Sequence, residues 1–175
     1  TTLLLDQEKW DQAVESAEAL IALLPDYTGE RNGYTLKALA HRGKKETAEE
    51  AVALETLASL SAEAFSAYTR LIELNFEEQN WDAVLANGER GFAINPFHQR
   101  IHYCKGCAHE AFAEPALAVE SFENALRLDP ANPSELRFRL ARLLQSDDEK
   151  KARRYLLDAL ADSPRYREAH GLLLK

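Results

Sequence analysis

The sequence lacks methionine altogether and has few of the residues that break helices. Its 175 residues include only 7 glycines and 6 prolines, while alanine, leucine, glutamate and arginine are abundant. This composition excludes a linker or low-complexity chain, and the abundant residue types are good helix formers. Because methionine is missing even at the first position, we expect a processed chain or a piece of a longer protein. The composition favours an all-α fold.

Long apolar runs and a basic leader are also missing. No run of about 18 apolar residues occurs, as a membrane span would need, and Thr1–Asp6 lacks the basic start of a signal peptide. The net charge of −8 argues against general nucleic-acid binding. We expect a soluble chain that binds no nucleic acid and, in this segment, no membrane. The cytoplasm is the favoured compartment, although the sequence does not determine it.

The charge is unevenly distributed along the chain. Residues 1–97 carry 8 basic and 17 acidic side chains, a net −9, whereas residues 134–175 carry 10 basic and 7 acidic ones, a net +3. Such a gradient arises on an ordinary solvated helical surface. Alternatively, it marks a surface for a partner with the opposite gradient.

A repeat of 34 residues is the strongest pattern in the sequence. Pro96, Pro130 and Pro164 follow one another at this interval. Residues 118–130 read Ala-x3-Phe-x2-Ala-x4-Pro, residues 152–164 read Ala-x3-Leu-x2-Ala-x4-Pro, and related copies end at Pro96 and Pro25. Positions i, i+4 and i+7 share one helical stripe, so each copy predicts the inward face of a helix that the proline ends.

Large residues recur at the same interval in the helix that should precede each of these, at Tyr34, Tyr68, His102, Leu136 and His170. With both halves together, the chain resembles the tetratricopeptide repeat family, whose pattern is Trp-x2-Leu-Gly-x2-Tyr, then Ala-x3-Phe, Ala and Pro. Lys105 and Arg139 depart from it, since they stand where leucine is usual. The resemblance implies an all-α solenoid of antiparallel helix pairs that forms a right-handed superhelix.

The periodicity predicts helices at about 6–24, 32–42, 46–59, 62–76, 79–93, 98–112, 115–128, 134–145, 149–161 and 165–175, with Ser61 and Ser134 as N-caps. Pro25 and Pro96 are 71 residues apart, three more than two repeats, and we place the extra residues in Asp26–Gly33. We expect a single domain: a half repeat at 1–30, a degenerate repeat at 31–64, repeats at 65–98, 99–132 and 133–166, and a terminal helix at 167–175. The half repeats at both ends predict that the native protein continues beyond at least one of them.

The sequence contains one group of metal-ligating residue types, namely His98, His102, Cys104, Cys107 and His109. On one helix the three histidines fall within about 40° of one another, and the two cysteines lie on the opposite side. We therefore predict no metal site, and we interpret His102 and His109 as packing residues; a weak surface site from His98 and His102 is the alternative. No phosphate loop, zinc-hydrolase motif or nucleophile elbow occurs. The sequence predicts no enzyme and no cofactor.

Members of this family hold a peptide or helix in a concave groove lined by the first helices. Carried over by repeat position, the resemblance implies Ser66, Thr69, Glu73, Phe97, Arg100, Tyr103, Cys107, Arg137, Ala141, Leu144 and Tyr166 as lining residues; Phe138 and Arg165 are interleaved with them. From the charges we expect a ligand whose acidic part lies near residues 100–166 and whose basic part lies near Glu73 and Glu77. The Lys, Asn and Arg residues of the clamp for acidic chaperone tails are absent.

The sequence thus predicts a protein–protein interaction scaffold whose partner is a protein or peptide. An alternative is the accessory tail of a larger enzyme, because residues 93–96 and 164–167 are similar to repeat tails that follow peptidase-like domains in some bacterial proteins. Self-association through the open terminal helices is a third possibility.

Overall fold

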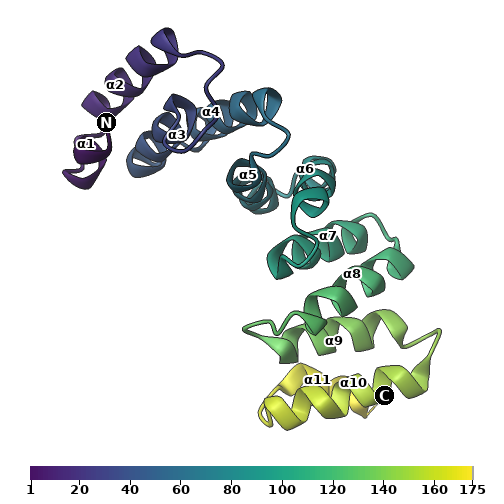
Figure 1. Cartoon of the computed structure of the whole chain (residues 1–175). Helices are drawn as coiled ribbons and strands as arrows, with labels where there is room; N and C mark the ends of the chain where they lie inside the picture. The colour runs from purple at the N-terminus through teal and green to yellow at the C-terminus, as the bar shows by residue number, and fades with distance from the viewer. Residues whose placement is uncertain (175) are drawn as a thin grey trace. The chain divides into compact units, whose positions relative to one another are not determined.

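The computed structural model describes residues 1–174, and its regular structure in this range is entirely helical (Figure 1). The helices are α1 (Thr2–Asp6), α2 (Trp10–Leu23), α3 (Gly33–Lys44), α4 (Thr47–Leu60), α5 (Phe65–Glu77), α6 (Trp81–Ile94), α7 (Gln99–Ala111), α8 (Pro115–Arg127), α9 (Pro133–Leu144), α10 (Glu149–Asp162) and α11 (Arg167–Leu173). None of these helices is long and apolar enough to cross a membrane.

The chain divides into two compact units, Thr1–Asn95 and Pro96–Lys175, called here the N-terminal and the C-terminal unit. Within each unit, helices that follow one another in sequence pack as antiparallel pairs. The all-α fold of paired helices predicted from the 34-residue period is therefore confirmed.

One turn geometry recurs at the ends of α1, α3, α5 and α7. The left-handed residue of this turn has a φ near 60°, and it is Glu8, Lys45, Gln79 or Ala113. In the second case the N–H of Lys45 donates to the carbonyl of Arg42 at 3.0 Å, and the next N–H donates to the carbonyl of His41 at 3.0 Å. These bonds satisfy the last carbonyls of the helix. From Lys45 to Ala113 the turn repeats every 34 residues, so the backbone has the period of the prolines.

The predicted helix at 6–24 is wrong at its N-terminal end. The turn at Glu8 separates the five-residue helix α1 from α2, which begins at Trp10. Because the hydrogen bonds of this turn match those after α3, α5 and α7, α1 occupies the place of a shortened first helix. A first helix that looked absent in the sequence is thus present as a little more than one turn.

Two predicted N-caps are also wrong. Ser61 is the C-cap of α4, and α5 begins only at Phe65 with Ala64 as its N-cap, three residues after the predicted start. At α9 the cap is Asn132, whose side chain accepts a hydrogen bond from the N–H of Glu135, while Ser134 is buried. Asparagine competes well with serine at this position.

The three extra residues lie where they were predicted, in the connection between α2 and α3. This loop spans residues 24–32 and is held by side chains. The amide of Asn32 donates to the carbonyl of Gly29 at 2.9 Å, and the hydroxyl of Tyr34 donates to the carbonyl of Pro25 at 2.8 Å.

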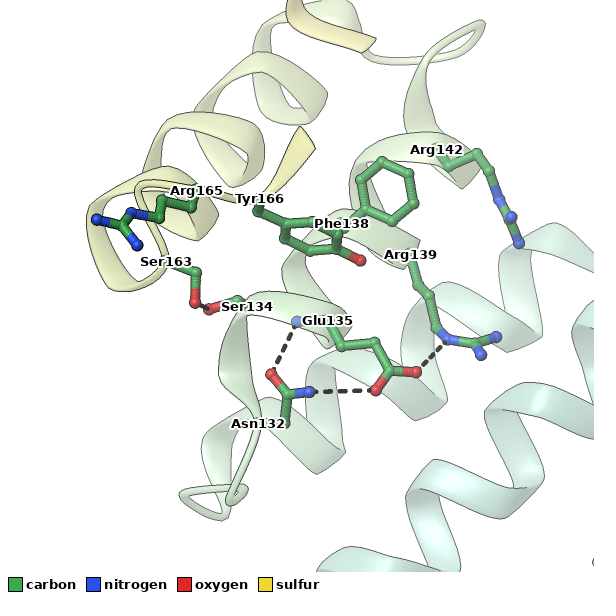
Figure 2. Close-up of a pocket in the computed structure, with 9 residues that line it drawn as sticks. All are labelled: Asn132, Ser134, Glu135, Phe138, Arg139, Arg142, Ser163, Arg165 and Tyr166. Atoms are coloured by element: carbon green, nitrogen blue, oxygen red, sulfur yellow. Dashed lines mark hydrogen bonds and ion pairs between the residues drawn. The ribbon is translucent and has the colours of Figure 1, made fainter. Parts of the chain in front are cut away.

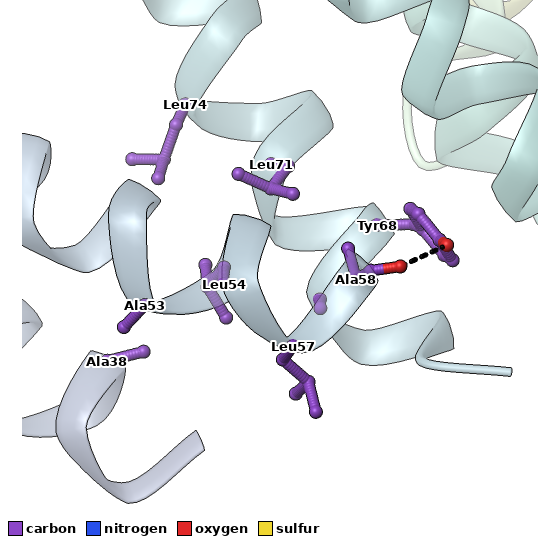
Figure 3. Close-up of a cluster of buried hydrophobic side chains, with 9 residues drawn as sticks. Ala38, Ala53, Leu54, Leu57, Ala58, Tyr68, Leu71 and Leu74 are labelled. Atoms are coloured by element: carbon purple, nitrogen blue, oxygen red, sulfur yellow. Dashed lines mark hydrogen bonds between the residues drawn. The ribbon is translucent and has the colours of Figure 1, made fainter. Parts of the chain in front are cut away.

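One hydrophobic cluster of the N-terminal unit is formed by the inward stripes of α3, α4 and α5 (Figure 3). Leu54, Leu57 and Leu71 are buried in it together with several alanines, and the hydroxyl of Tyr68 donates to the carbonyl of Ala58 at 3.0 Å. Small residues let the helices approach closely, so the leucines fill the remaining space.

In the C-terminal unit the side chain of Phe122 on α8 is fully buried against Gly106 on α7. A Cβ atom at position 106 would lie 2.5 Å from the Phe122 ring, so this pair of helices requires a glycine there. A second cluster joins α9, α10 and α11 through Ala141, Leu156 and Ala169. It positions the turn between α10 and α11 against α9.

Candidate functional site

The C-terminal unit contains a cavity of about 580 Å³ between α9 and the turn that leads into α11 (Figure 2). It is lined by Asn132, Ser134, Glu135, Phe138, Arg139, Arg142, Ser163, Arg165 and Tyr166. A volume of this size is in the range of sites that bind small ligands or a few side chains of a peptide.

One wall of the cavity is a single stripe of α9. Glu135, Phe138, Arg139 and Arg142 are spaced i, i+3, i+4 and i+7, which places them on one helical face. The helix begins at Pro133, whose fixed φ suits the first helical position. The capping bond from the N–H of Glu135 to Asn132 Oδ1, 3.3 Å long, holds this end of the wall in place.

The opposite wall comes from the four residues between α10 and α11. The hydroxyls of Ser134 and Ser163 are hydrogen-bonded at 2.8 Å and fix this turn against the start of α9. The rings of Phe138 and Tyr166 meet with their centroids 5.1 Å apart and an interplanar angle of 49°. Burial is the main cause that raises the pKa of Tyr166, so its hydroxyl stays protonated at neutral pH. The cavity therefore has an aromatic surface with one hydrogen-bonding tip.

The charged groups of the wall form a network with α7. Arg139 donates to Glu135 at 3.1 Å and to Glu110 at 2.8 Å, and Arg142 forms an ion pair with the same Glu110. Burial opposes the charge of Arg139, but nearby Cys107, Tyr103 and Glu135 raise the pKa of its guanidinium. Arg139 is thus a fixed positive charge.

Arg142 and Arg165 differ from Arg139 because they are exposed. The side chain of Arg142 is 52% exposed despite its ion pair, and Arg165 forms no ion pair within residues 1–174. Guanidinium groups bind carboxylates with two parallel hydrogen bonds. These two arginines are therefore the groups of the cavity that are placed to receive an anionic side chain.

Tyr103 on α7 extends the network away from the cavity. Its hydroxyl donates to Glu135 at 3.0 Å, and the guanidinium groups of Arg100 and Arg139 lie 5.3 and 5.8 Å from the centre of its ring. Both distances allow cation–π attraction. Burial raises the pKa of Tyr103 well above its usual value, so the ring acts as a neutral platform between two cations.

The structure brings together only some of the predicted site residues. Phe138, Arg165 and Tyr166 line the cavity, and Tyr103 with Arg100 joins it through Glu135. Arg137 is directed elsewhere: it forms an ion pair with Asp162 at the end of α10.

Neither of the other two predicted residues lines the cavity. Phe97 precedes α7 and is 77% exposed. Glu73 belongs to the N-terminal unit, where it pairs with Arg70 at 2.9 Å beside a smaller hollow of about 260 Å³ on α3 and α5.

Sequence reasoning missed Glu135, Arg139 and Arg142. The position of Arg139 was the available signal, because an arginine replaces the leucine usual at that place in the repeat. In the structure this departure from the pattern is the centre of the ion network. A search of α9 for one polar stripe would have found all three residues.

The histidines and cysteines of α7 do not gather at one site. Cys104 and Cys107 are buried free thiols, and burial raises the pKa of Cys107. His102 is buried with its Nε2 2.8 Å from the carbonyl oxygen of Pro96, and His109 Nδ1 lies 2.7 Å from a Glu114 oxygen. Within residues 1–174 no three ligand-type side chains are arranged to hold a metal ion.

Comparison with known proteins gives a likeness of fold only. No family model matches the sequence, and no curated protein matches it either. Among solved structures, a MamA protein superposes with a TM-score of 0.75 at 15% identity, over 95% of this chain and 90% of that one. YrrB, described as a TPR protein with an unusual peptide-binding site, gives a TM-score of 0.74 at 14% identity, over 97% and 86%. A thermophilic TPR protein of Thermus thermophilus, TTC0263, gives 0.54 at 19% identity, over 99% and 95%.

The chain has the tetratricopeptide-repeat fold. In the repeat frame predicted from the sequence, α3, α5, α7, α9 and α11 are first helices, and α2, α4, α6, α8 and α10 are second helices. In that frame the cavity lies between two consecutive first helices, α9 and α11.

Proposed function

We propose that this tetratricopeptide-repeat chain is a protein-interaction scaffold, and that the cavity between α9 and α11 holds part of a peptide or helix of its partner. The role is one of binding and not of catalysis. Repeats of this kind use an extended surface built from stacked helix pairs, and YrrB, which has the same fold, is described as peptide-binding.

One observation carries the proposal: two packed aromatic rings and two exposed arginines line the same cavity. Phe138 and Tyr166 offer contact area whose geometry is already fixed by their mutual packing, so little entropy is lost on binding. Arg142 and Arg165 add positive charge at the cavity wall. This combination favours a segment that carries an apolar or aromatic side chain next to an Asp or Glu.

The net +3 of residues 134–175 supports the same choice of ligand, because long-range attraction speeds the encounter with an acidic segment. Arg100 and Tyr103 are proposed to continue this surface along α7. A role in ligand binding for Glu73, Phe97 and Arg137 remains a prediction from the sequence alone.

Site-specific photo-crosslinking in cells of the source organism tests the proposal. Benzoylphenylalanine, which resembles the natural ring, replaces Phe138 in the cavity, and in a control chain it replaces Leu117, an exposed residue on α8. We expect a covalent adduct with a defined protein from position 138 that is missing from position 117. The same adducts from both positions, or adducts from position 117 alone, would contradict a binding role for the cavity.

A further inference from the structure

A second groove lies in the N-terminal unit, formed by the two second helices α2 and α4 with α3 between them. α3 packs against α2 as extensively as against α4. The groove has a volume of about 530 Å³ and is lined by Glu18, Ile21, Ala22, Tyr34, Lys37, His41, Ala48, Glu49, Val52, Ala53 and Thr56. All of these residues lie within α2, α3 and α4, so the groove is separate from the cavity of the C-terminal unit.

The lining residues form three helical stripes. Tyr34, Lys37 and His41 on α3 are spaced i, i+3 and i+7 and form the floor. The walls are the residues of α2 and α4, each a helix of 14 residues and therefore about 21 Å long. A groove bounded by helices along its length has the shape that receives another helix. A helix of about three to four turns matches the length of these walls.

The apolar part of the groove is suited to a helix. Ala22, Ala48 and Ala53 are small and let a backbone approach closely, while Ile21 and Val52 offer branched side chains. Val52 is 62% exposed, although it is a large apolar residue in the wall of a groove. Burying such residues against an apolar stripe of a partner is the main source of affinity in this mode of recognition.

A polar group of the groove also has an unused bonding site. His41 is buried, and its Nδ1 lies 2.8 Å from a carboxylate oxygen of Glu46. The other ring nitrogen, Nε2, is buried and has no hydrogen-bond partner among residues 1–174. Nδ1 donates to the carboxylate in the neutral ring, which leaves Nε2 as an acceptor. Because buried polar atoms are normally satisfied, this nitrogen favours a ligand that brings a hydrogen-bonding group, such as a hydroxyl, into the groove.

The charges at the rim of the groove determine which sign of charge the partner helix should carry. Glu18 is paired with Lys37 at 2.6 Å, and Glu49 forms no ion pair within residues 1–174. The surrounding unit is strongly acidic, since residues 1–97 carry a net −9. Basic side chains on the flanks of an inserted helix would meet this field favourably, whereas acidic ones would be repelled.

From these observations we infer that the groove between α2 and α4 is a docking site for a basic amphipathic helix of a partner protein. The helix places an apolar stripe over Val52 and Ile21, a hydroxyl or amine donor at His41 Nε2, and Lys or Arg residues at the rim. This groove belongs to the N-terminal unit and the proposed peptide cavity to the C-terminal unit, and the two sites share no lining residue.

A displayed library of random 20-residue peptides tests the inference. It is selected on the whole natural chain, and the enriched peptides are then measured on the variants. We expect the enriched peptides to be helical in complex, with apolar residues at i, i+3 or i+4 and i+7 and an excess of Lys and Arg. Their affinity should fall at least about 10-fold on Val52→Glu, because the change places a charge in an apolar contact. It should stay within about 2-fold on Leu117→Glu, the same kind of change on an exposed residue of α8.

The His41→Asn variant separates the hydrogen bond from the rest of the groove. The Asn amide can still donate to Glu46, but no acceptor remains at the position of Nε2. Binding of the same peptides should weaken about 5-fold, the loss of roughly one hydrogen bond. Circular dichroism and thermal melting check that each variant is folded.

Three results would overturn the inference. Enriched peptides without the helical apolar pattern or without basic residues would exclude the proposed ligand. Peptides that bind Val52→Glu as tightly as the natural chain would place the site elsewhere. Concentration-dependent self-association of the chain in sedimentation runs, abolished by Val52→Glu, would assign the groove to a second copy and not to a partner helix.

Discussion

Replacement of Glu50 by glutamine is expected to destabilise the N-terminal unit strongly. Glu50 on α4 is fully buried and pairs with arginines of both neighbouring helices. One of its oxygens accepts from Arg42 Nε at 2.7 Å and from Arg70 Nε at 2.7 Å, and the other accepts from Arg70 Nη2 at 3.1 Å. The variant Glu50→Gln keeps the shape of the side chain but removes the charge that holds α3, α4 and α5 together.

The magnitude follows from the burial of the three groups. Removing one partner of a buried ion pair costs roughly 3–5 kcal/mol, because the remaining charge is left without compensation. Here the side chains of Arg42 and Arg70 are 43% and 21% exposed, so water replaces part of the lost interaction. We therefore expect the free energy of unfolding to fall by about 2–3 kcal/mol at neutral pH.

The pH dependence of this effect has a definite sign. Burial opposes the charge of Glu50, but Arg70 and Arg42 lower the pKa of its carboxyl below the usual value. A carboxyl with a lowered pKa in the folded state contributes stability above its unfolded pKa of about 4.3 and loses it as the pH falls through the folded value. The difference between the natural chain and Glu50→Gln should therefore be full at pH 7 and shrink below about pH 4.

Urea denaturation followed by circular dichroism at several pH values measures this effect. Glu49→Gln is the matched control, because Glu49 is the exposed neighbour on the same helix, and its loss should change the unfolding free energy by less than about 0.5 kcal/mol. If Glu50→Gln unfolds at the same urea concentration as the control at pH 7, the ion cluster does not stabilise the unit and the reasoning is refuted.

Three further predictions concern the C-terminal unit. Gly106→Ala should lower the unfolding free energy by about 1–2 kcal/mol, because the new Cβ would lie 2.5 Å from Phe122. Gly171→Ala should raise the unfolding free energy by about 0.5–1 kcal/mol, because there is open space around Gly171. Thermal melting distinguishes the two variants. Ala113→Gly should stabilise the chain by up to about 1 kcal/mol, because Ala113 has a φ of 56°, which glycine adopts without strain. Urea denaturation measures the change. A clear loss of unfolding free energy would show that the turn does not hold its left-handed form. Elemental analysis of protein purified without chelators should find no stoichiometric zinc, and one tightly bound ion per chain would show that the thiols and imidazoles of α7 can face one another.

The regular part of the fold could be predicted from the sequence because the repeat reports inward-facing positions directly. Small residues at i and i+7 with a large one between them predict a close helix pair, and Phe122 with Gly106 shows this packing in the structure. Most predicted helices agree with the structure to within two residues. The failures lie at helix starts, where a single left-handed residue such as Glu8 or a competing cap such as Asn132 decides the boundary.

The centres of the two ion clusters could be located from the sequence, but their partners could not be predicted. Glu50 stands where other repeats have Ala118 or Ala152, and Arg139 stands where leucine is usual. Each departure from the pattern is the centre of an ion cluster that includes a partner on another helix, Arg70 for Glu50 and Glu110 for Arg139. Because those partners are distant in sequence, the periodicity marks the positions and says nothing of the network. The same holds for Arg137, whose ion pair with Asp162 depends on where α10 ends.

The central claim is that the arginines around the cavity of α9 and α11 hold an acidic segment of a partner. The affinity of the chain for that segment tests the claim most directly. A fluorescent peptide covering the segment captured by the crosslinker at position 138 is titrated with three proteins, followed by anisotropy at low and high salt. We expect the double variant Arg142→Glu/Arg165→Glu to bind at least about 10-fold more weakly than the natural chain and with less dependence on salt. The variant Arg153→Glu/Arg154→Glu, with the same change of charge on exposed residues of α10, should bind within about 2-fold of it. Equal losses in both variants, or none in the first, would contradict the claim.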